Sequence, residues 1–323
     1  MRIVVTGANG FVGRATCANL LDAGHDVTAL VRRAGADSGT AESRAHERVI
    51  ADDNFASLAT GTSSSLAPAD AFVLLAARVH VMRDNAADPL AEYRQVNVEG
   101  SLNVARAALR AGAARLVFVS SIKALGEGEP GRPWREDDQP APADPYGVTK
   151  LEAEQALAAF GQEHGMEVVI LRPPLVYGPG VKANFEQMMR AVDRGVPLPL
   201  GGIEARRSMV YVGNLADAIR FVATRPEQTS GVFHVTDGDD LSVADMIRGL
   251  AQALGKPARL LPVPASWLRA AGALTGRSAQ IDRLTNPLRM DSTRLREGLG
   301  WTPPTSVTQG LAITVRAFNE VRR

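Results

Sequence analysis

Tyr146 and Lys150 are the two residues in this sequence whose types and spacing most directly suggest chemistry. They lie four positions apart, so their side chains share one face if the segment is helical. A phenol with a pKa of about 10 is a poor base near neutral pH, and a nearby ammonium group stabilises its phenolate. Lowering that pKa by about three units requires roughly 4 kcal/mol of differential interaction. The pair therefore predicts a tyrosine that moves a proton to or from a substrate oxygen.

Ser121 supports this interpretation through its place at the end of an apolar run. Leu116–Ser120 is typical of a buried strand, and ligands of open α/β folds bind at the carboxyl ends of parallel strands. The Ser121 hydroxyl can then hold the same substrate oxygen as Tyr146, or it can simply cap the following turn. We predict that Ser121, Tyr146 and Lys150 form a catalytic group, with Tyr146 and Lys150 also contacting a cofactor.

A glycine-rich loop near the N-terminus predicts that this cofactor is a dinucleotide. Gly7, Gly10 and Gly13 directly follow the first predicted strand and open the first predicted helix. The spacing allows a tight turn, close approach to a pyrophosphate and close helix packing, while the helix N-terminus offers N–H donors. The contacts predicted in this loop are Gly7, Asn9, Gly10, Phe11, Val12 and Gly13.

The end of the second predicted strand bears on which dinucleotide binds. An acid there accepts a hydrogen bond from the ribose 2′-hydroxyl of NAD, whereas this chain has Arg32 and Arg33, and guanidinium groups pair well with phosphate. We expect an NAD(P) site that favours NADP(H); the alternatives are that both arginines are solvated or that one stacks on adenine. Asp52 and Asp53, near the third predicted strand, are further candidates. Asp52 either accepts a hydrogen bond from the adenine amino group or is an exposed loop carboxylate.

Strand-like and helix-like segments alternate through the first half of the chain. Strands are predicted near Ile3–Thr6, Val27–Val31, Arg48–Ala51, Ala71–Ala76, Leu116–Ser120 and Glu167–Leu171. Helices are predicted near Phe11–Ala23, Glu92–Ala111 and Pro145–His164. Asp144 should cap the third helix and Gly165 should end it. The fold class is therefore α/β, with a Rossmann-type doubly wound parallel sheet.

The sequence changes character after Arg172. Pro173 and Pro174 interrupt the alternation, and later helices are predicted near Phe185–Arg194, Leu215–Thr224, Val243–Leu254 and Ala265–Ala273. We expect residues 1–172 to form the Rossmann domain, with strands near 209–236 returning to it. Residues 173–323 should form a smaller α/β substrate-binding region. The segment Gly126–Asp144 is either a lid or a solvated connector.

Composition and charge exclude several classes of protein. Hydrophobic residues make up 45% and charged residues 22%, which is typical of a globular protein. The 36 basic and 35 acidic residues nearly cancel, so no overall field recruits nucleic acid or an anionic membrane. We see no signal-peptide pattern and no apolar run of ~18–20 residues, so membrane insertion is not expected. The single Cys17 favours a cytoplasmic location, and the five scattered histidines predict no metal site.

Taken in order along nearly the whole chain, these segments resemble the extended short-chain dehydrogenase/reductase family, in its branch of UDP-glucose 4-epimerase-like nucleotide-sugar enzymes. The matching segments are Thr6-Gly7-x-x-Gly10-x-x-Gly13, Ala76-Ala77, Asn97-Val-Glu-Gly100, Ser120-Ser121, Tyr146-x-x-x-Lys150, Arg172-Pro-Pro-Leu-Val-Tyr-Gly-Pro179, Arg207-x-x-Val-Tyr-Val and Leu299-Gly-Trp301.

The resemblance implies roles for further residues. Ser121, Tyr146 and Lys150 would carry the family's catalytic roles, and the implied cofactor contacts are Ala76, Ala77, Asn97 and Pro173. Arg207 would grip a nucleotide diphosphate, with Asn184 and Arg283 as further substrate contacts. A homodimer is also implied, through a four-helix bundle of the Glu92–Ala111 and Tyr146–His164 helices.

Several positions depart from the family pattern. Leu175 replaces a usual asparagine, Leu74 replaces a histidine, and Val31 replaces the acid that ends the second strand. Substrate contacts and cofactor preference therefore cannot be copied wholesale. Dehydratase relatives place an Asp-Glu pair after the catalytic hydroxyl, whereas Ile122 and Lys123 stand there in this chain. Dehydration is thus disfavoured, and Lys123 is a candidate to face the sugar.

These features predict hydride transfer at C4 of a UDP-hexose. A 4-epimerase returns the hydride to the turned 4-keto sugar, whereas a 4-keto reductase consumes NAD(P)H, as in making UDP-N-acetylquinovosamine; either would serve polysaccharide biosynthesis. Arg32 and Arg33 favour the reductase, and the overall resemblance favours the epimerase. A non-catalytic NADP(H)-sensing binding protein of the same fold is an alternative from another class, which the intact catalytic residues disfavour.

Overall fold

A seven-stranded sheet forms the centre of the molecule, in the strand order β10-β6-β5-β4-β1-β2-β3. Every neighbouring pair is parallel, which confirms the predicted Rossmann-type sheet. The strands are β1 Arg2–Thr6, β2 Asp26–Val31, β3 His46–Val49, β4 Ala71–Leu74, β5 Arg115–Val119, β6 Glu167–Arg172 and β10 Gly231–His234. This computed structural model describes residues 1–32, 45–50, 52, 54–60, 66–79 and 88–321, so the predicted contacts Arg33 and Asp53 lie outside the described residues.

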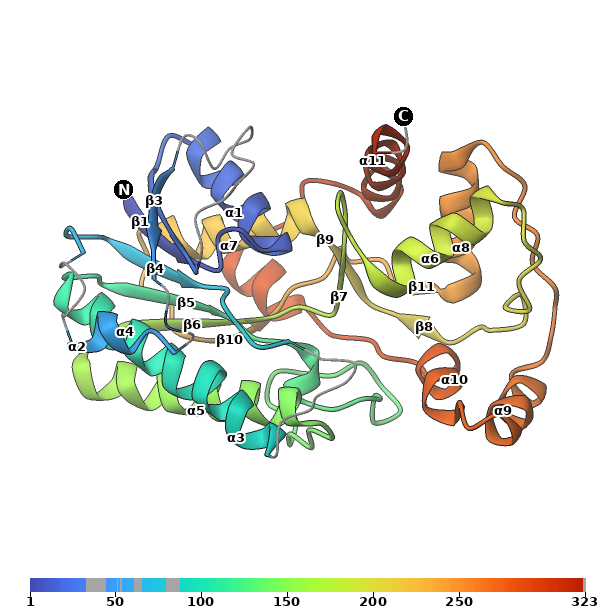
Figure 1. Cartoon of the computed structure of the whole chain (residues 1–323), viewed down its shortest axis with the longest axis horizontal. Helices are drawn as coiled ribbons and strands as arrows, with labels where there is room; N and C mark the ends of the chain where they lie inside the picture. The colour runs from blue at the N-terminus through green and yellow to red at the C-terminus, as the bar shows by residue number, and fades with distance from the viewer. Residues whose placement is uncertain (33–44, 51, 53, 61–65, 80–87, 322–323) are drawn as a thin grey trace.

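Helices cover both faces of this sheet (Figure 1). On one face lie α1 Phe11–Asp22 and α7 Val212–Thr224, and on the other lie α2 Ala56–Thr60, α4 Gly100–Arg110 and α5 Pro145–His164. Successive strand residues point to opposite faces, so Val117 packs in the cluster beneath α1 and α7 while Leu116 packs in the cluster beneath α4 and α5. The sheet is therefore buried on both sides, as its apolar strands require.

The two helices expected to bear functional residues form as local signals predict, with one difference. In α5 the Asp144 carboxylate accepts the N–H of Gly147 at 2.7 Å, and Gly165 ends the helix in the left-handed conformation with φ 65°. The helix predicted at 92–111 is instead three consecutive pieces. They are α3 Pro89–Arg94, the π-helical turn η2 Gln95–Glu99, and α4. Among the strands, β3 begins two residues before the predicted start and β4 ends at Leu74.

A second group of elements packs beside the carboxyl edge of the sheet, on the right in Figure 1. It contains β7 Leu175–Tyr177, α6 Ala183–Asp193, β8 Arg206–Arg207, β9 Met209–Tyr211, β11 Leu241–Ser242, α8 Val243–Leu254, α9 Ala265–Leu274, α10 Ser278–Thr285 and α11 Val307–Glu320. The π-helical turn η4 Arg294–Gly298 instead packs against β10 of the main sheet. β7 pairs with β9, and β8 pairs with β11. Of the strands expected to return near 209–236, β10 joins the main sheet and β9 does not. None of the described helices has the length and apolar character needed to cross a membrane.

The segment Gly126–Asp144 packs against the C-terminal part of the chain. Trp134 is 7% exposed. Its backbone N–H donates to the Arg289 carbonyl at 2.8 Å, and its backbone carbonyl accepts the N–H of Asp291 at 2.8 Å. The Glu129 carboxylate binds the Arg289 guanidinium with a shortest distance of 2.5 Å. The segment therefore joins the two groups of elements along one side of the sheet edge.

A buried ion pair fixes α5 to the sheet. The Arg172 Nε at the end of β6 donates to the Glu154 Oε1 at 2.9 Å, and both side chains are only 4% exposed. Desolvating two charges is costly, and their mutual attraction compensates only while both are present. The pair thus makes the position of α5 sensitive to the loss of either partner.

We predict that Glu154→Gln lowers the free energy of unfolding by about 3–5 kcal/mol, because it leaves the Arg172 charge buried without its counter-charge. Urea unfolding followed by circular dichroism measures this change. Glu152→Gln is the matched control on the same helix, since Glu152 pairs with an exposed Arg94 and its loss should leave unfolding nearly unchanged. Equal effects of the two substitutions would contradict the prediction.

Candidate active site

The structure brings Ser121 and Tyr146 together at the carboxyl edge of the sheet. Ser121 follows β5 and precedes a short 3-10 turn, η3 Ile122–Ala124, while Tyr146 lies in the first turn of α5. The Ser121 hydroxyl lies close enough to the Tyr146 phenol to lower its pKa by hydrogen bonding. The Ser121 Oγ also accepts the N–H of Lys123 at 3.2 Å. Ser121 therefore caps the turn and contacts the tyrosine at the same time.

Lys150 lies one helical turn beyond Tyr146 and is almost fully buried. Its side chain is 2% exposed, and its Nζ donates to the Val119 carbonyl at 2.7 Å, at the end of β5. The ammonium group also lies 4.2 Å from the centre of the Phe118 ring. Burial lowers the pKa of Lys150 to about 7, because a charged ammonium is poorly solvated there.

The pKa of Tyr146 moves in the opposite direction from the one that the sequence suggested. Burial raises it to about 12, although the hydrogen bond with Ser121 lowers it, and the charges of Asp144 and Tyr93 raise it further. In the protein alone the phenol is therefore protonated at neutral pH and suited to donate a proton. To accept one, it needs additional positive potential, which the positively charged ring of a bound oxidised nicotinamide would supply.

The glycine loop has the geometry of a phosphate cradle. Gly7 has φ +64°, and a Cβ there would lie 2.8 Å from the Ala76 nitrogen. A Cβ at Gly13 would lie 2.1 Å from the Gly7 carbonyl oxygen. Gly10 stands at the N-cap of α1, so the first N–H groups of that helix open onto a loop with glycine at both ends. These residues fit a dinucleotide pyrophosphate at the N-terminus of α1.

Two other residues assigned to the cofactor connect the strand ends to the catalytic helix. Asn97 is 1% exposed, its Oδ1 accepts the N–H of Arg78 at 2.8 Å, and its Nδ2 donates to the Thr149 Oγ1 at 3.0 Å. The Pro173 carbonyl accepts the N–H of Ile122 at 3.0 Å. Both contacts help to fix the edge at which Ser121 and Tyr146 meet.

The residues predicted to contact the adenosine part of the cofactor do not form a preorganised site in this structure. Arg32 is exposed just after the end of β2. The Asp52 carboxylate accepts the N–H of Ser57 at 2.9 Å and its hydroxyl at 2.6 Å. Partial burial raises the pKa of Asp52, but these hydrogen bonds outweigh it and hold the pKa below its usual value. Asp52 thus orders the start of α2, whatever further contact it makes.

Lys123 has two carboxylate partners that sequence reasoning missed. Its Nζ donates to the Glu127 Oε1 at 2.8 Å and to the Asp144 carboxylate, which also caps α5. Burial lowers the pKa of Lys123, but the hydrogen bonds to Asp144 and Glu127 raise it overall, so the ammonium stays charged. The spacing of Lys123 and Glu127, four residues apart, and the predicted cap at Asp144 were the available signals.

Arg207 faces this cluster from the other group of elements. Its Nη1 donates to the carbonyls of Arg283 and Asn286, each at 2.8 Å, and burial lowers its pKa. The Arg283 Nε lies 3.7 Å from the Glu127 Oε2, which links Arg207 through α10 to the Lys123 cluster. Asn184 is exposed in the first turn of α6. The structure thus places Arg207 and Arg283 together.

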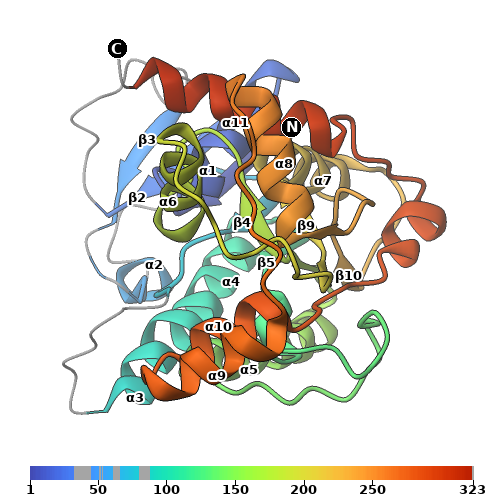
Figure 2. The ribbon, with the colours of Figure 1, turned by 90° about the vertical axis from the view of Figure 1, so that its right-hand side faces the viewer.

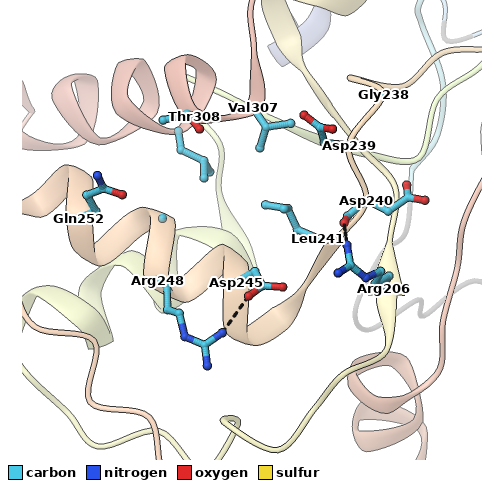
Figure 3. Close-up of a pocket in the computed structure, with 12 residues that line it drawn as sticks. Arg206, Gly238, Asp239, Asp240, Leu241, Asp245, Arg248, Gln252, Val307 and Thr308 are labelled. Carbon is cyan, nitrogen blue, oxygen red and sulfur yellow. Dashed lines mark hydrogen bonds and ion pairs between the residues drawn. The ribbon is translucent and has the colours of Figure 1, made fainter.

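A separate pocket of about 450 Å³ lies behind Arg207, between β11, α8 and α11 (Figure 3). Neighbouring side chains of a strand point to opposite sides, so Arg206 lines this pocket while Arg207 faces α10. Its charges pair locally, as in the 2.8 Å contact between Arg248 and Asp245. The described residues contain no group of three or more His, Cys, Asp or Glu side chains placed to hold a metal ion.

A parallel sheet with a glycine cradle at its first strand, and with serine, tyrosine and lysine gathered at its carboxyl edge, is the arrangement expected of a dinucleotide-dependent enzyme. Comparisons with known proteins agree: residues 3–235 match the model of the NAD dependent epimerase/dehydratase family. The chain is 42% identical over 320 residues to a UDP-glucose 4-epimerase of Vibrio cholerae, covering 98% of this chain and 95% of that protein. The chain therefore belongs to the NAD dependent epimerase/dehydratase family, an enzyme family, as the resemblance predicted.

Solved structures share the fold. The UDP-glucose 4-epimerase of Thermotoga maritima superposes with a TM-score of 0.79 at 24% identity, covering 100% of both chains. That of Thermus thermophilus, in complex with NAD, superposes with a TM-score of 0.77 at 25% identity, covering 99% of both chains. The family match, and not these structures, argues against a non-catalytic sensor, because the family is one of enzymes.

We predict that Lys123→Met moves the pH profile of turnover to higher pH. The substitution removes the positive charge beside Asp144, whose negative charge already raises the pKa of Tyr146. The part of the pH profile that reports the Tyr146 pKa therefore moves to higher pH, whether the phenol acts as acid or as base. Lys123→Arg keeps the positive charge and should restore the original profile. An unchanged profile in Lys123→Met would show that Lys123 does not influence Tyr146.

Proposed function

We propose that this enzyme is a UDP-hexose 4-epimerase that removes and returns a hydride at C4 while Tyr146 exchanges the C4 hydroxyl proton. The neighbouring Ser121 and Tyr146, with Lys150 fixed one turn along α5, carry the proposal because these residue types at the carboxyl edge of a parallel sheet are suited to proton transfer. The Vibrio cholerae relative supports the substrate class, since it is named for this reaction.

The chain's own residues would divide the work as follows. When bound, the nicotinamide would supply the acceptor and then the donor of the hydride. Tyr146 takes the proton of the C4 hydroxyl as the C4–H bond breaks, which leaves a 4-keto sugar, and gives the proton back when the hydride returns to the opposite face. Ser121 donates a hydrogen bond to the same sugar oxygen. Lys150, in its protonated form, would add positive charge near the phenol and favour its ionised form.

The substrate's diphosphate would bind to the second group of elements, across from the carboxyl edge of the sheet. Arg207 uses one nitrogen for its two carbonyl contacts, and a guanidinium group carries five N–H donors in all. We therefore assign Arg207 to the diphosphate of UDP, with Arg283 beside it. We also assign Lys123 to the sugar. It is charged and lies two residues after Ser121, and it would have to leave one of its carboxylate partners to contact the substrate.

Two wider assignments belong to the same proposal. The homodimer would form through α3, α4 and α5, which lie side by side on one outer face of the sheet (Figure 1). A cytoplasmic location is supported by the use of cysteine, because the sequence contains the single Cys17 and therefore forms no internal disulfide.

A 4-keto reductase acting on the same carbon is the second candidate. Two observations favour it: Val31 stands where NAD-specific relatives of this fold place an acid, with Arg32 directly after it, and the Tyr146 phenol is protonated and suited to donate to a ketone oxygen. A single assay separates the candidates. Interconversion of UDP-glucose and UDP-galactose, or of their acetamido forms, without net change in NADH supports the epimerase, whereas oxidation of NAD(P)H only with a 4-keto sugar supports the reductase. If neither reaction is observed, both candidate functions are excluded.

We predict that Tyr146→Phe lowers turnover at least ~10²-fold while cofactor binding is retained, because only the proton-transfer group is lost. Steady-state kinetics and a fluorescence titration with NADH measure the two properties. Tyr211→Phe, which removes a phenol oxygen from β9, is the control and should keep turnover. Activity of Tyr146→Phe close to wild type would rule out this mechanism.

We also predict that the double substitution of Arg32 and Arg33 by alanine weakens NADPH binding far more than NADH binding. The two cofactors differ only by the 2′-phosphate that the guanidinium groups would contact. Calorimetric titration with each nucleotide measures the selectivity. Equal losses for both would show that the arginines do not read the phosphate.

A further inference from the structure

The Glu127 carboxylate lies between two cations that the proposed function assigns to the substrate. Its Oε1 accepts a hydrogen bond from the Lys123 Nζ at 2.8 Å, and its Oε2 lies 3.7 Å from the Arg283 Nε. Lys123 belongs to the turn that follows β5, whereas Arg283 belongs to α10 of the second group of elements. The two segments lie side by side although they are far apart in the chain (Figure 1, Figure 2). One carboxylate therefore contacts both groups of elements where they meet.

The charge of Glu127 also acts on Arg207. Burial lowers the pKa of Arg207, the Glu127 charge raises it, and the Arg283 charge lowers it. The two guanidinium groups are thus close enough to repel each other, and a nearby anion offsets this repulsion. Within the chain itself, Glu127 supplies part of that negative charge. The same two arginines are the ones that we assign to the diphosphate of UDP.

Hydrogen bonds fix the backbone on each side of Glu127. The Gly126 N–H donates to the Ile122 carbonyl at 3.3 Å, and the Gly128 carbonyl accepts the indole N–H of Trp134 at 3.0 Å. Trp134 is itself buried. The fold therefore holds the Glu127 side chain beside these cations.

The ion pair between Glu127 and Arg283 is nevertheless a weak one. The Glu127 side chain is 34% exposed and that of Arg283 is 52% exposed, and exposed pairs contribute little to stability. A stronger contact nearby joins the two groups of elements, because Glu129, which is 2% exposed, binds Arg289. A bound anion can therefore take Arg283 from Glu127 with little effect on the fold.

We propose that the Glu127 carboxylate competes with the substrate's diphosphate for Arg283, so that nucleotide binding exchanges one ion pair for another. The inference rests on the proposed function, in which Arg207 and Arg283 bind the diphosphate of UDP. A diphosphate carries more negative charge than one carboxylate and offers several oxygens to two guanidinium groups, so it displaces Glu127. The exchange lowers the affinity for every UDP-linked ligand, the product included, and thereby favours product release.

A purely structural role for Glu127 predicts a different effect on binding. If the carboxylate only held α10 in place, its loss would leave Arg207 and Arg283 less well positioned and would weaken nucleotide binding. Competition predicts that its loss strengthens UDP binding, because Arg283 is no longer engaged and a negative charge beside the diphosphate is gone. A gain in affinity is also a result that a folding defect does not produce.

Calorimetric titration of the full-length protein with UDP and with uridine tests the proposal. We expect Glu127→Gln to lower the Kd for UDP at least about fivefold, which is the combined effect of a lost competing ion pair and a lost repulsion. Uridine carries no phosphate, so its binding should be unchanged. Asp137→Asn removes one exposed charge from the same segment and is the matched control. It should bind UDP as the wild-type protein does.

The Arg283→Gln background tests whether Glu127 acts through Arg283. In that background the gain in UDP affinity from Glu127→Gln should be at least about twofold smaller, because the competing contact is already absent. Should Arg283→Gln bind UDP too weakly to measure, the comparison of UDP with uridine and with Asp137→Asn decides the outcome.

Several results would overturn the inference. They are unchanged or weaker UDP binding by Glu127→Gln, an equal gain for uridine, an equal gain in Asp137→Asn, or an equal gain in the Arg283→Gln background. Each of these leaves the proposed function standing as long as the wild-type protein binds UDP. Absence of UDP binding by the wild-type protein would overturn the proposed function and this inference together.

Discussion

The hydrogen bond from the buried Lys150 ammonium to the Val119 carbonyl is the contact on which the site depends. It joins the helix that carries Tyr146 to the end of the strand that precedes Ser121. Because Lys150 is 2% exposed, the bond forms in a medium where it is strong and where its loss leaves an unpaired cation. The meeting of the serine and tyrosine hydroxyls follows from that fixed distance between helix and strand.

Two further charged contacts, one at the N-terminus of α5 and one farther along it, also fix this helix in place. At its N-terminus Asp144 caps the helix and binds Lys123, and farther along Glu154 binds Arg172 at the end of β6. The same burial that fixes these groups raises the pKa of Tyr146 and lowers that of Lys150. A bound positive ring would reverse part of this effect on Tyr146, so the site is arranged for a proton that moves only when the cofactor is present.

The sequence predicted what short segments determine by themselves. The cap at Asp144, the stop at Gly165 and the cradle at Gly7 and Gly13 are local, and they form as expected. The partners of Lys123 and the docking of Trp134 on residues 289–291 depend on segments that meet only in the folded chain, so periodicity could not reveal them.

Deuterium at C4 of the substrate offers the most direct test of the central claim that a hydride moves at this carbon. With UDP-glucose labelled at C4, the account predicts UDP-galactose that retains the deuterium at C4, formed more slowly than from unlabelled substrate. Mass spectrometry and proton NMR of the product measure both properties. Replacement of the deuterium by solvent hydrogen would contradict the account, because it would mean that the C4 hydrogen leaves as a proton.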